Sequence, residues 1–500
     1  MTRIILYFLT LILGVLTANA QQITGRIVDL ESNESIAYAT IRVGETDLIS
    51  NDNGYFTLSG QDITESTLIS VSYIGYAPQN VSVNQLKSNN NTVKLNLVAY
   101  TIGETYVSNT KPNPDEIMKL VNENLAENYK NTDYKSTVFI RGSSTFKPEN
   151  IEMKLKKSTD LSKAEIKEIN NEVQSLISKS TNTPTQIYSD KLVDVYKVNN
   201  KYKLGVIKAV QLKDENRSSD YDELQKSSTE IFYKVMDTTK FYRIKSGLIG
   251  SKDTISFSKE FNANKKEKKE NNNLKNLKSG IKNSIEESAF DGQKSFMAVN
   301  IDFIKDTDAY SYSYTEVTYL GDDLVFVIDF KPKKSRAKYS GRLYINEADY
   351  AIVRADYKLA EGKKPQGINL KLLLGVKISE GLNKGIVMYK KNPATHTYYL
   401  HYSLHEKEQY FYLSRPIKFI ELTDGKGKDK ISYDIKIEGR NIGKSEYLNL
   451  SMQDISTSDY EAFQEKEFEY EILKKYDPNI WKGYNIIEPV EEMKRFEVVE

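Results

Sequence analysis

The first part of the chain alternates apolar and polar residues in short runs separated by turns. Such alternation predicts strands with one buried face. Asn51–Gly54 is typical of a hairpin turn, because Asn and Gly tolerate the positive φ that tight turns need. Five to seven strands over residues 22–98 predict a small β-sandwich. The alternating runs are Ile23–Asp29, Ala37–Val43, Tyr55–Leu58, Leu68–Tyr73 and Val93–Leu97.

Four motifs in this segment, in order, resemble the carboxypeptidase-like regulatory domain. They are Ile23–Asp29 (ITGRIVD), Ile36–Ile41 (IAYATI), Asn53–Leu58 (NGYFTL) and Val71–Tyr76 (VSYIGY). That family is a transthyretin-like β-sandwich found at the N-termini of many bacterial envelope proteins. The resemblance implies a non-catalytic accessory module. One departure concerns the loop before the turn, where the family often has Thr-Asp and this chain has Ser50 and Asn51.

Apolar residues at helical spacing follow this module. Asn113 and the proline after it are typical of the first turn of a helix. Ser162 and Glu165 form a capping box in front of a second helical segment. A third helix is predicted over Tyr221–Val235, and a β-hairpin is predicted over Ile187–Leu212.

The segment from Ser295 to about Gly439 alternates almost throughout and predicts antiparallel sheet. Within it, Leu324–Phe330 is apolar on both faces and is expected to be a central strand. Tyr310, Tyr312 and Tyr314 share one face of a strand. They are a candidate ligand face, for example for a glycan, although strand tyrosines commonly have only structural roles.

The meander Gly341–Ile345 and Tyr350–Arg354 resembles the open half-barrel sheets of periplasmic lipoprotein carriers. This resemblance implies an apolar ligand in the concavity of region 295–440. Any antiparallel meander has a similar rhythm, so an ordinary packed sheet is the alternative.

The expected fold is mainly β with α+β character: an N-terminal β-sandwich followed by a larger antiparallel-sheet domain with helical insertions. Residues 259–289 alternate in charge and are expected to be a solvated mobile insertion, with contact to an anionic lipid or polyanion as the alternative. The tail is expected to be helical over Tyr460–Lys475, and Trp481 is expected to anchor it on the body. The segments are 1–20 (signal peptide), 22–98 (module), 99–112 (linker), 113–258 (α+β), 259–289 (charged insertion), 295–440 (sheet) and 441–500 (tail).

The first twenty residues predict export. Arg3 precedes the apolar run Ile4–Leu16, and Ala18–Ala20 fits a small-x-small cleavage pattern. The run is shorter than the roughly 20 residues of a membrane span. The chain has no Cys, which excludes disulfides, thiolate metal sites and a lipid-modified Cys. Its net charge of +1 gives no basic field that would favour nucleic acid as a partner.

The motifs for catalysis are weak or missing. His405–Glu408 fits the first half of a carboxypeptidase zinc site, but no His follows it, and the other two His are His396 and His401. We expect all three to be uncoordinated surface residues. No Gly-x-Ser-x-Gly elbow supports a Ser-His-Asp triad. Calcium could bind the acidic turns Asp306–Asp308 and Asp322–Asp323, but isolated acidic turns are usually solvated.

The sequence therefore predicts no catalytic, cofactor-binding or metal residue. The favoured function is a non-enzymatic periplasmic binding or assembly component of an outer-membrane complex, peripheral to the membrane, with other envelope proteins as partners. The alternatives are a periplasmic carrier of a lipid or other apolar ligand and an unrecognised hydrolase. The module also heads TonB-dependent receptors, but roughly 400 further residues are too few for their plug and 22-stranded barrel.

Overall fold

The computed structural model describes most of the chain. The predicted signal peptide and the predicted helix over Tyr221–Val235 lie outside the described residues, as does nearly all of the 99–112 linker. The described ranges are 21–60, 62–98, 112–130, 132–181, 184–214, 241–246, 249–256, 273–288, 302–363, 367–371, 375–423 and 426–498.

The N-terminal module is a sandwich of two four-stranded sheets, as predicted, with strand orders β4-β1-β8-β6 and β3-β2-β5-β7. Gly25 lies under the ring of Phe56, where a Cβ would come within 2.4 Å of the ring. Gly54 takes the positive φ of the predicted turn. The elements are β1 Gln21–Asp29, β2 Thr40–Val43, β3 Thr46–Ile49, β4 Tyr55–Gly60, β5 Leu68–Ser72, β6 Tyr76–Ala77, β7 Gln79–Ser82, α2 Val83–Ser88 and β8 Thr92–Leu97.

The rest of the described chain is built on one large sheet, with the order β14-β15-β16-β17-β19-β20-β21-β9-β10-β11-β22 and with β12, β13 and β18 attached. Its strands are β9 Tyr134–Ser158, β10 Thr185–Val198, β11 Lys201–Lys213, β12 Phe241–Ser246, β13 Ile249–Ser256, β14 Tyr310–Leu320, β15 Asp323–Pro332, β16 Tyr339–Asn346, β17 Ile352–Leu359, β18 Gly367–Leu370, β19 Val376–Lys391, β20 Tyr398–Thr423, β21 Lys426–Gln453 and β22 Glu471–Leu473. β21 pairs with β9, so the expected segments 113–258 and 295–440 share this sheet. The expected end near 440 is also wrong, because β21 continues to Gln453.

The two predicted helix caps are confirmed, but the expectations for the charged segment and for the tail are wrong. Asn113 caps α3, and the Ser162–Glu165 box forms at the start of α4. Part of the charged segment folds as α7, which buries Leu277 in the main core. The tail has only the short α10 where a long helix was expected, and β22 follows it. The helices are α3 Pro114–Asn128, α4 Lys163–Thr181, α7 Asn273–Ser288, α8 Asp302–Lys305, α10 Thr457–Ala462 and α11 Glu491–Lys494.

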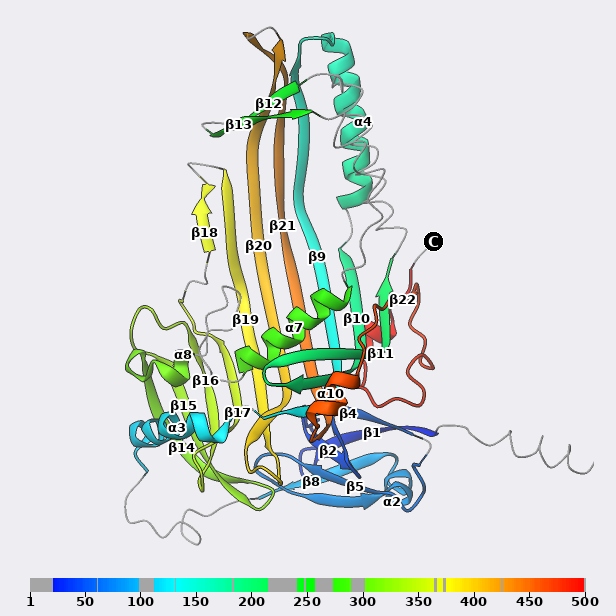
Figure 1. Ribbon diagram of the computed structural model, residues 1–500, viewed down its shortest axis with the longest axis vertical. Coiled ribbons are helices and arrows are strands. Elements are labelled where there is room, and N and C mark those ends of the chain that lie inside the picture. The colour runs from blue at the N-terminus through cyan, green and yellow to red at the C-terminus, as the bar shows by residue number, and fades with distance from the viewer. Residues whose placement is uncertain are drawn as a thin grey trace, which may run out of the picture.

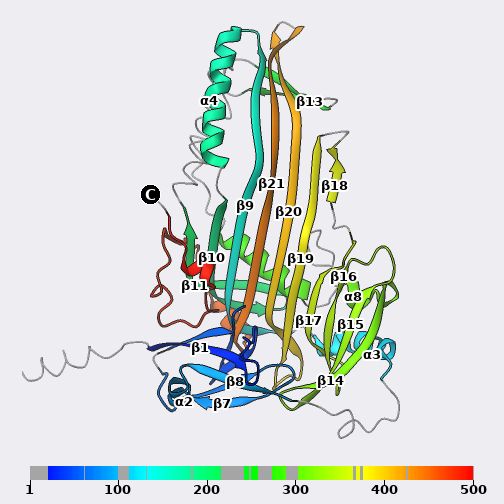
Figure 2. The ribbon, with the colours of Figure 1, turned by 180° about the vertical axis from the view of Figure 1, so that it is seen from behind.

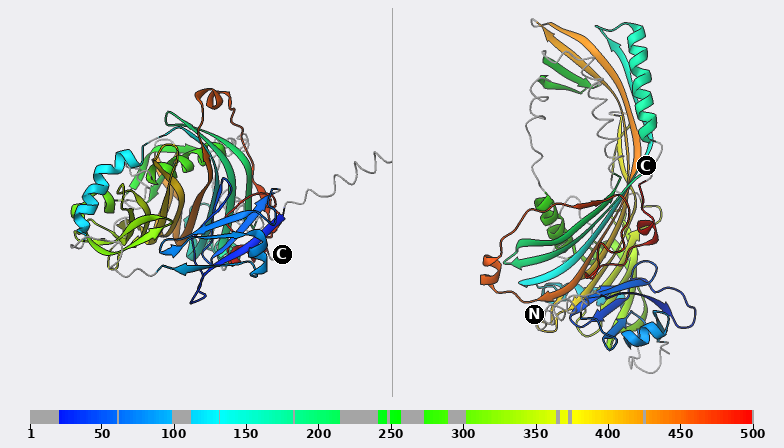
Figure 3. Two further views of the ribbon diagram at one scale, coloured as in Figure 1. Left: turned by 90° about the horizontal axis from the view of Figure 1, so that it is seen from below. Right: turned by 90° about the vertical axis from the view of Figure 1, so that its right-hand side faces the viewer.

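Three strands extend far beyond the rest of the sheet (Figure 1). β9, β20 and β21 have 25, 26 and 28 residues, which corresponds to roughly 80–90 Å at about 3.3 Å per residue. We call the projecting part the arm: residues 147–158, 376–380, 409–423 and 426–443, with α4, β12 and β13 alongside. The arm is curved, and the N-terminal module lies at the opposite end of the molecule (Figures 2 and 3).

Candidate functional site

The N-terminal module and the base of the large sheet share a hydrophobic core. Buried module residues such as Ile41 and Phe56 belong to the same cluster as Phe139 of β9 and Leu448 of β21. Trp481 joins this cluster and packs edge-on against Phe139, with ring centroids 5.5 Å apart. The expectation that Trp481 anchors the tail is confirmed. Because this core is shared, the module is seated on the sheet and is not a separately tethered domain.

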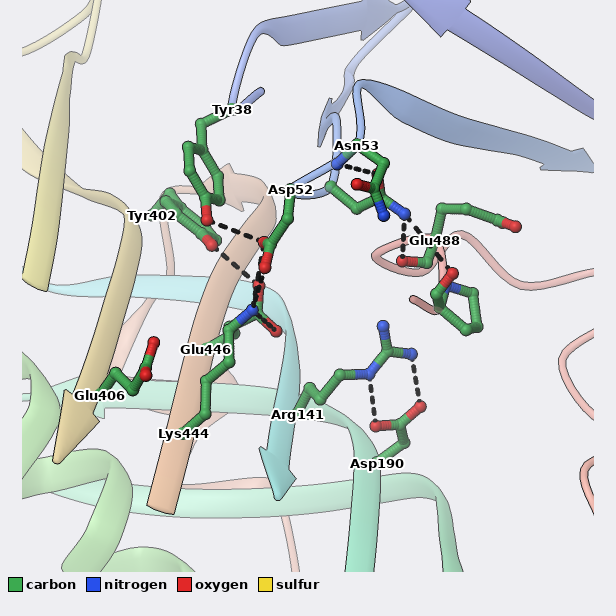
Figure 4. A network of polar contacts seen from close by, with 12 residues as sticks. Tyr38, Asp52, Asn53, Arg141, Asp190, Tyr402, Glu406, Lys444, Glu446 and Glu488 are labelled. Atoms are coloured by element: carbon green, nitrogen blue, oxygen red, sulfur yellow. Dashed lines mark hydrogen bonds and ion pairs between the residues drawn. The ribbon is translucent and has the colours of Figure 1, made fainter. Parts of the chain in front are cut away.

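A polar network lies at the edge of the contact between the module and the sheet (Figure 4). Lys444 of β21 contacts both carboxylate oxygens of Asp52, at 2.8 and 3.1 Å. The Tyr38 hydroxyl donates to Asp52 at 2.7 Å, and its ring stacks on that of Tyr402. The Tyr402 hydroxyl in turn donates to Glu446. Burial alone would raise the pKa of Asp52, but Lys444 and Tyr38 outweigh it and hold that pKa below its usual range.

Tyr38 adopts a positive φ of 60°, which is uncommon for a bulky residue. This conformation is held in place by the stacking on Tyr402 and the bond to Asp52. Strain of this kind persists only where the surroundings over-determine it. The module is therefore fitted to this one position on the sheet.

A buried ion pair lies beneath the network. Arg141 of β9 makes two hydrogen bonds to Asp190 of β10, at 2.9 and 2.7 Å. Burial would lower the pKa of Arg141, and Asp190 reverses this effect, so the pKa is raised. The tail also contacts the module, because Thr57 donates to Glu488, which is paired with Lys494 at 2.9 Å. These contacts hold three distant parts of the chain together.

The candidate tyrosine face points into the protein. Tyr310 and Tyr312 are buried in the main core, where their hydroxyls donate to Asp302 and to the carbonyl of Phe303. Tyr314 packs against the same core, and a register shift follows it. The three residues share a face as predicted. That face is filled by neighbouring side chains, and Tyr310 and Tyr312 are only 2% and 9% exposed.

The histidines do not match the expectation that all three lie on the surface. His396 is exposed in a turn, but His401 is buried, and His405 is half-buried with Asn383 at 3.1 Å. The acidic turn at Asp306 is neutralised by Arg336, which binds both carboxylate oxygens. No group of three or more potential metal ligands occurs among the described residues.

The arm has one apolar and one charged face. Residues paired across β19, β20 and β21 form an apolar stripe: Val376, Ile378, Phe411, Leu413, Ile435 and Ile437. α4 covers the adjoining part of this face, where its Val173 and Ile177 pack on Ile151. The stripe itself is half-buried, and Ile378 is 46% exposed. On the other face, Arg440 bridges Glu149 and Glu408.

Sequence reasoning missed the arm as a surface. The alternation over residues 431–438 (ISYDIKIE) was the available signal, because every second residue is apolar or aromatic. It predicts a strand with one buried face. It does not reveal that the strand extends beyond the body of the protein.

Comparison with known proteins identifies the first domain. Residues 23–107 match the CarboxypepD_reg-like domain, a regulatory and non-catalytic module. No match to a curated protein was found. Among solved structures, the chain is similar to the MucA/MucB complex of Pseudomonas aeruginosa, with 5% identity, 68% of this chain and 100% of that chain covered, and a TM-score of 0.16.

A second similar structure is a Bacteroides fragilis protein described as membrane-associated and of unknown function. It has 10% identity, 86% of this chain and 98% of that chain covered, and a TM-score of 0.12. At these TM-scores neither likeness carries an argument about fold or function. Within the described ranges, no helix has the length and apolar character needed to cross a membrane.

Proposed function

We propose that the protein is a non-enzymatic binding or assembly component of the bacterial envelope, and that its arm contacts another envelope protein. The observation that carries this proposal is the apolar stripe on a projecting part of the fold. Clustered apolar side chains at a surface are typical of interaction sites. The module, the sheet and the tail share one core at the foot of the arm, and this core would hold the arm in a fixed direction.

The carrier alternative receives less support. It requires an open apolar concavity in region 295–440. The inner face of β14–β17 instead packs against α3 and α8, through residues such as Met118 and Phe303. A sheet face filled by helices leaves little room for an acyl chain.

Co-purification from native envelopes tests the proposal, with two matched variants. Ile378→Asp places a charge in the stripe, and Ile207→Asp does the same at a similarly exposed residue of β11 (45%). We expect a specific envelope protein to co-purify with the wild type and Ile207→Asp but not with Ile378→Asp. Recovery of the chain alone under every detergent condition would overturn the proposal, as would equal retention by both variants.

We further propose that residues 1–20 direct export and are removed, and that the mature protein lies in the periplasm, peripheral to the outer membrane. The support is the charge, apolar run and small-x-small pattern of this segment. N-terminal sequencing of protein from the envelope fraction should start at Gln21. An intact Met1 in the cytoplasmic fraction would refute export.

A further inference from the structure

A buried histidine lies where the module meets the sheet. His401 is 2% exposed and lies at a register shift between β19 and β20. Met388 pairs with Tyr402 and the next residue, Tyr389, pairs with Leu400, so His401 is the extra residue of a bulge. Bulges re-aim side chains, and sequence alternation cannot reveal them.

The charged groups around His401 come from the module and from the sheet. Asp47 of β3 is buried and pairs with Lys390 of β19. Arg42 and Glu45 of the module act electrostatically on Lys390, and the phenol of Tyr399 is near Asp47. Of these groups, Asp47 and Lys390 act directly on His401, which is not part of the network of Figure 4.

The bonding in this cluster is incomplete. Neither ring nitrogen of His401 has a well-formed hydrogen bond to a described residue, although the backbone of Asn449 lies nearby. Oδ1 of Asp47 also lacks a described partner. A buried imidazole in such surroundings is tolerated only while it is neutral.

We propose that His401 makes the seating of the N-terminal module on the sheet sensitive to acid: the module is seated while His401 is neutral, and protonation of its imidazole loosens this contact. Opening of the interface would hydrate the ring and separate it from Lys390. The proposal is independent of the identity of any partner.

Acid weakens the interface because the pKa of His401 is lowered when the interface is closed. Burial is the largest cause and the charge of Lys390 adds to it, so the pKa of His401 falls to about 4, while Asp47 opposes the change. The closed interface therefore binds the proton less well than the open one. Its stability is complete above the ordinary histidine pKa of about 6.5 and declines as pH falls towards 4, by up to about tenfold in the opening equilibrium per pH unit.

The natural absence of Cys allows single-cysteine probes. Met388→Cys, beside the Tyr402 that stacks on module residue Tyr38, reports opening of the interface. Ala355→Cys, buried in the main core, reports global unfolding. Labelling by 4,4′-dithiodipyridine, which reacts with thiols in acid, is measured from pH 7 to 4 and normalised to the unfolded chain at each pH.

We expect labelling of Met388→Cys to accelerate by at least tenfold between pH 6.5 and 4.5, while Ala355→Cys stays protected. In a His401→Phe background this acceleration should disappear, and His401→Gln is the substitute if that variant does not fold. The same acceleration without His401 would overturn the proposal. Parallel acceleration at both cysteines would also overturn it, because the whole protein would then be unfolding.

Discussion

Asn170 of α4 hydrogen-bonds both backbone groups of Leu155 in β9, as a residue of a neighbouring strand would. Its side chain accepts from the Leu155 N–H at 2.7 Å and donates to the Leu155 carbonyl at 2.9 Å. Leu155 pairs with Tyr433 of β21 on one side, but β10 pairs with the other side of β9 only up to Phe146, so Leu155 lies beyond the part of β9 that β10 covers. Unpaired strand edges promote aggregation, and α4 protects this one.

Replacing Asn170 should therefore weaken the arm. Asn170→Leu leaves both groups of Leu155 without their partner, which should cost about 1–3 kcal/mol locally. Limited proteolysis should cut α4 or β9 sooner, and light scattering should show more association. Glu168→Gln, on the exposed side of the same helix, is the control. Unchanged proteolysis of Asn170→Leu would mean that apolar packing alone holds α4.

The buried pair Arg141–Asp190 should be costly to break but replaceable as a unit. Arg141→Met leaves the Asp190 carboxylate buried without its partner and should lower the free energy of unfolding by about 3–5 kcal/mol. The double variant Arg141→Met/Asp190→Leu should recover most of this loss. Urea denaturation of the single and double variants measures the coupling, and additive losses would contradict the expectation.

Two glycines should respond oppositely to the same substitution. A Cβ on Gly341 would lie 1.9 Å from the carbonyl oxygen of Asp356, so Gly341→Ala should displace the backbone of β17 and destabilise the protein by more than about 2 kcal/mol. Gly280 lies exposed in α7 with open space around it, and Gly280→Ala should stabilise by up to about 1 kcal/mol. Thermal unfolding of the pair tests both signs.

Trp481 should be needed to hold the tail in the core that the module and the sheet share. Trp481→Ala removes a fully buried ring and should cost about 3–5 kcal/mol. Trp481→Phe keeps an aromatic side chain beside Phe139 and should lose less than half of that. If both variants unfold at the wild-type urea concentration, the tail does not contribute to the core.

The sequence allowed prediction of elements whose signals are local. The Asn113 cap, the Ser162 capping box and the ordered motifs of the module all depend on neighbouring residues, and all of them form. The pairing of β21 with β9 joins residues almost 300 positions apart, such as Asn441 and Phe146, and no local pattern indicates it. The main core also includes Leu277 of α7, which lies inside a segment expected to be a solvated insertion or a contact for an anionic lipid or polyanion.

The site residues were harder to predict for the same reason. Alternation correctly placed Tyr310, Tyr312 and Tyr314 on one face but could not say that α8 covers it. The burial of His401 depends on a bulge and on a module more than 300 residues earlier in the chain. Neither property is encoded near the residue itself.

The contact between Asn51 and the backbone of Glu488 spans 437 positions along the chain. The module is synthesised well before the tail residues that complete its contact with the sheet. Contacts of such long range form slowly, because the intervening chain loses conformational entropy before the contacts can stabilise the fold. The contact between module, sheet and tail can therefore be completed only after Trp481 and Glu488 have been made, and a nascent chain that stops before Trp481 should expose the apolar underside of its first domain.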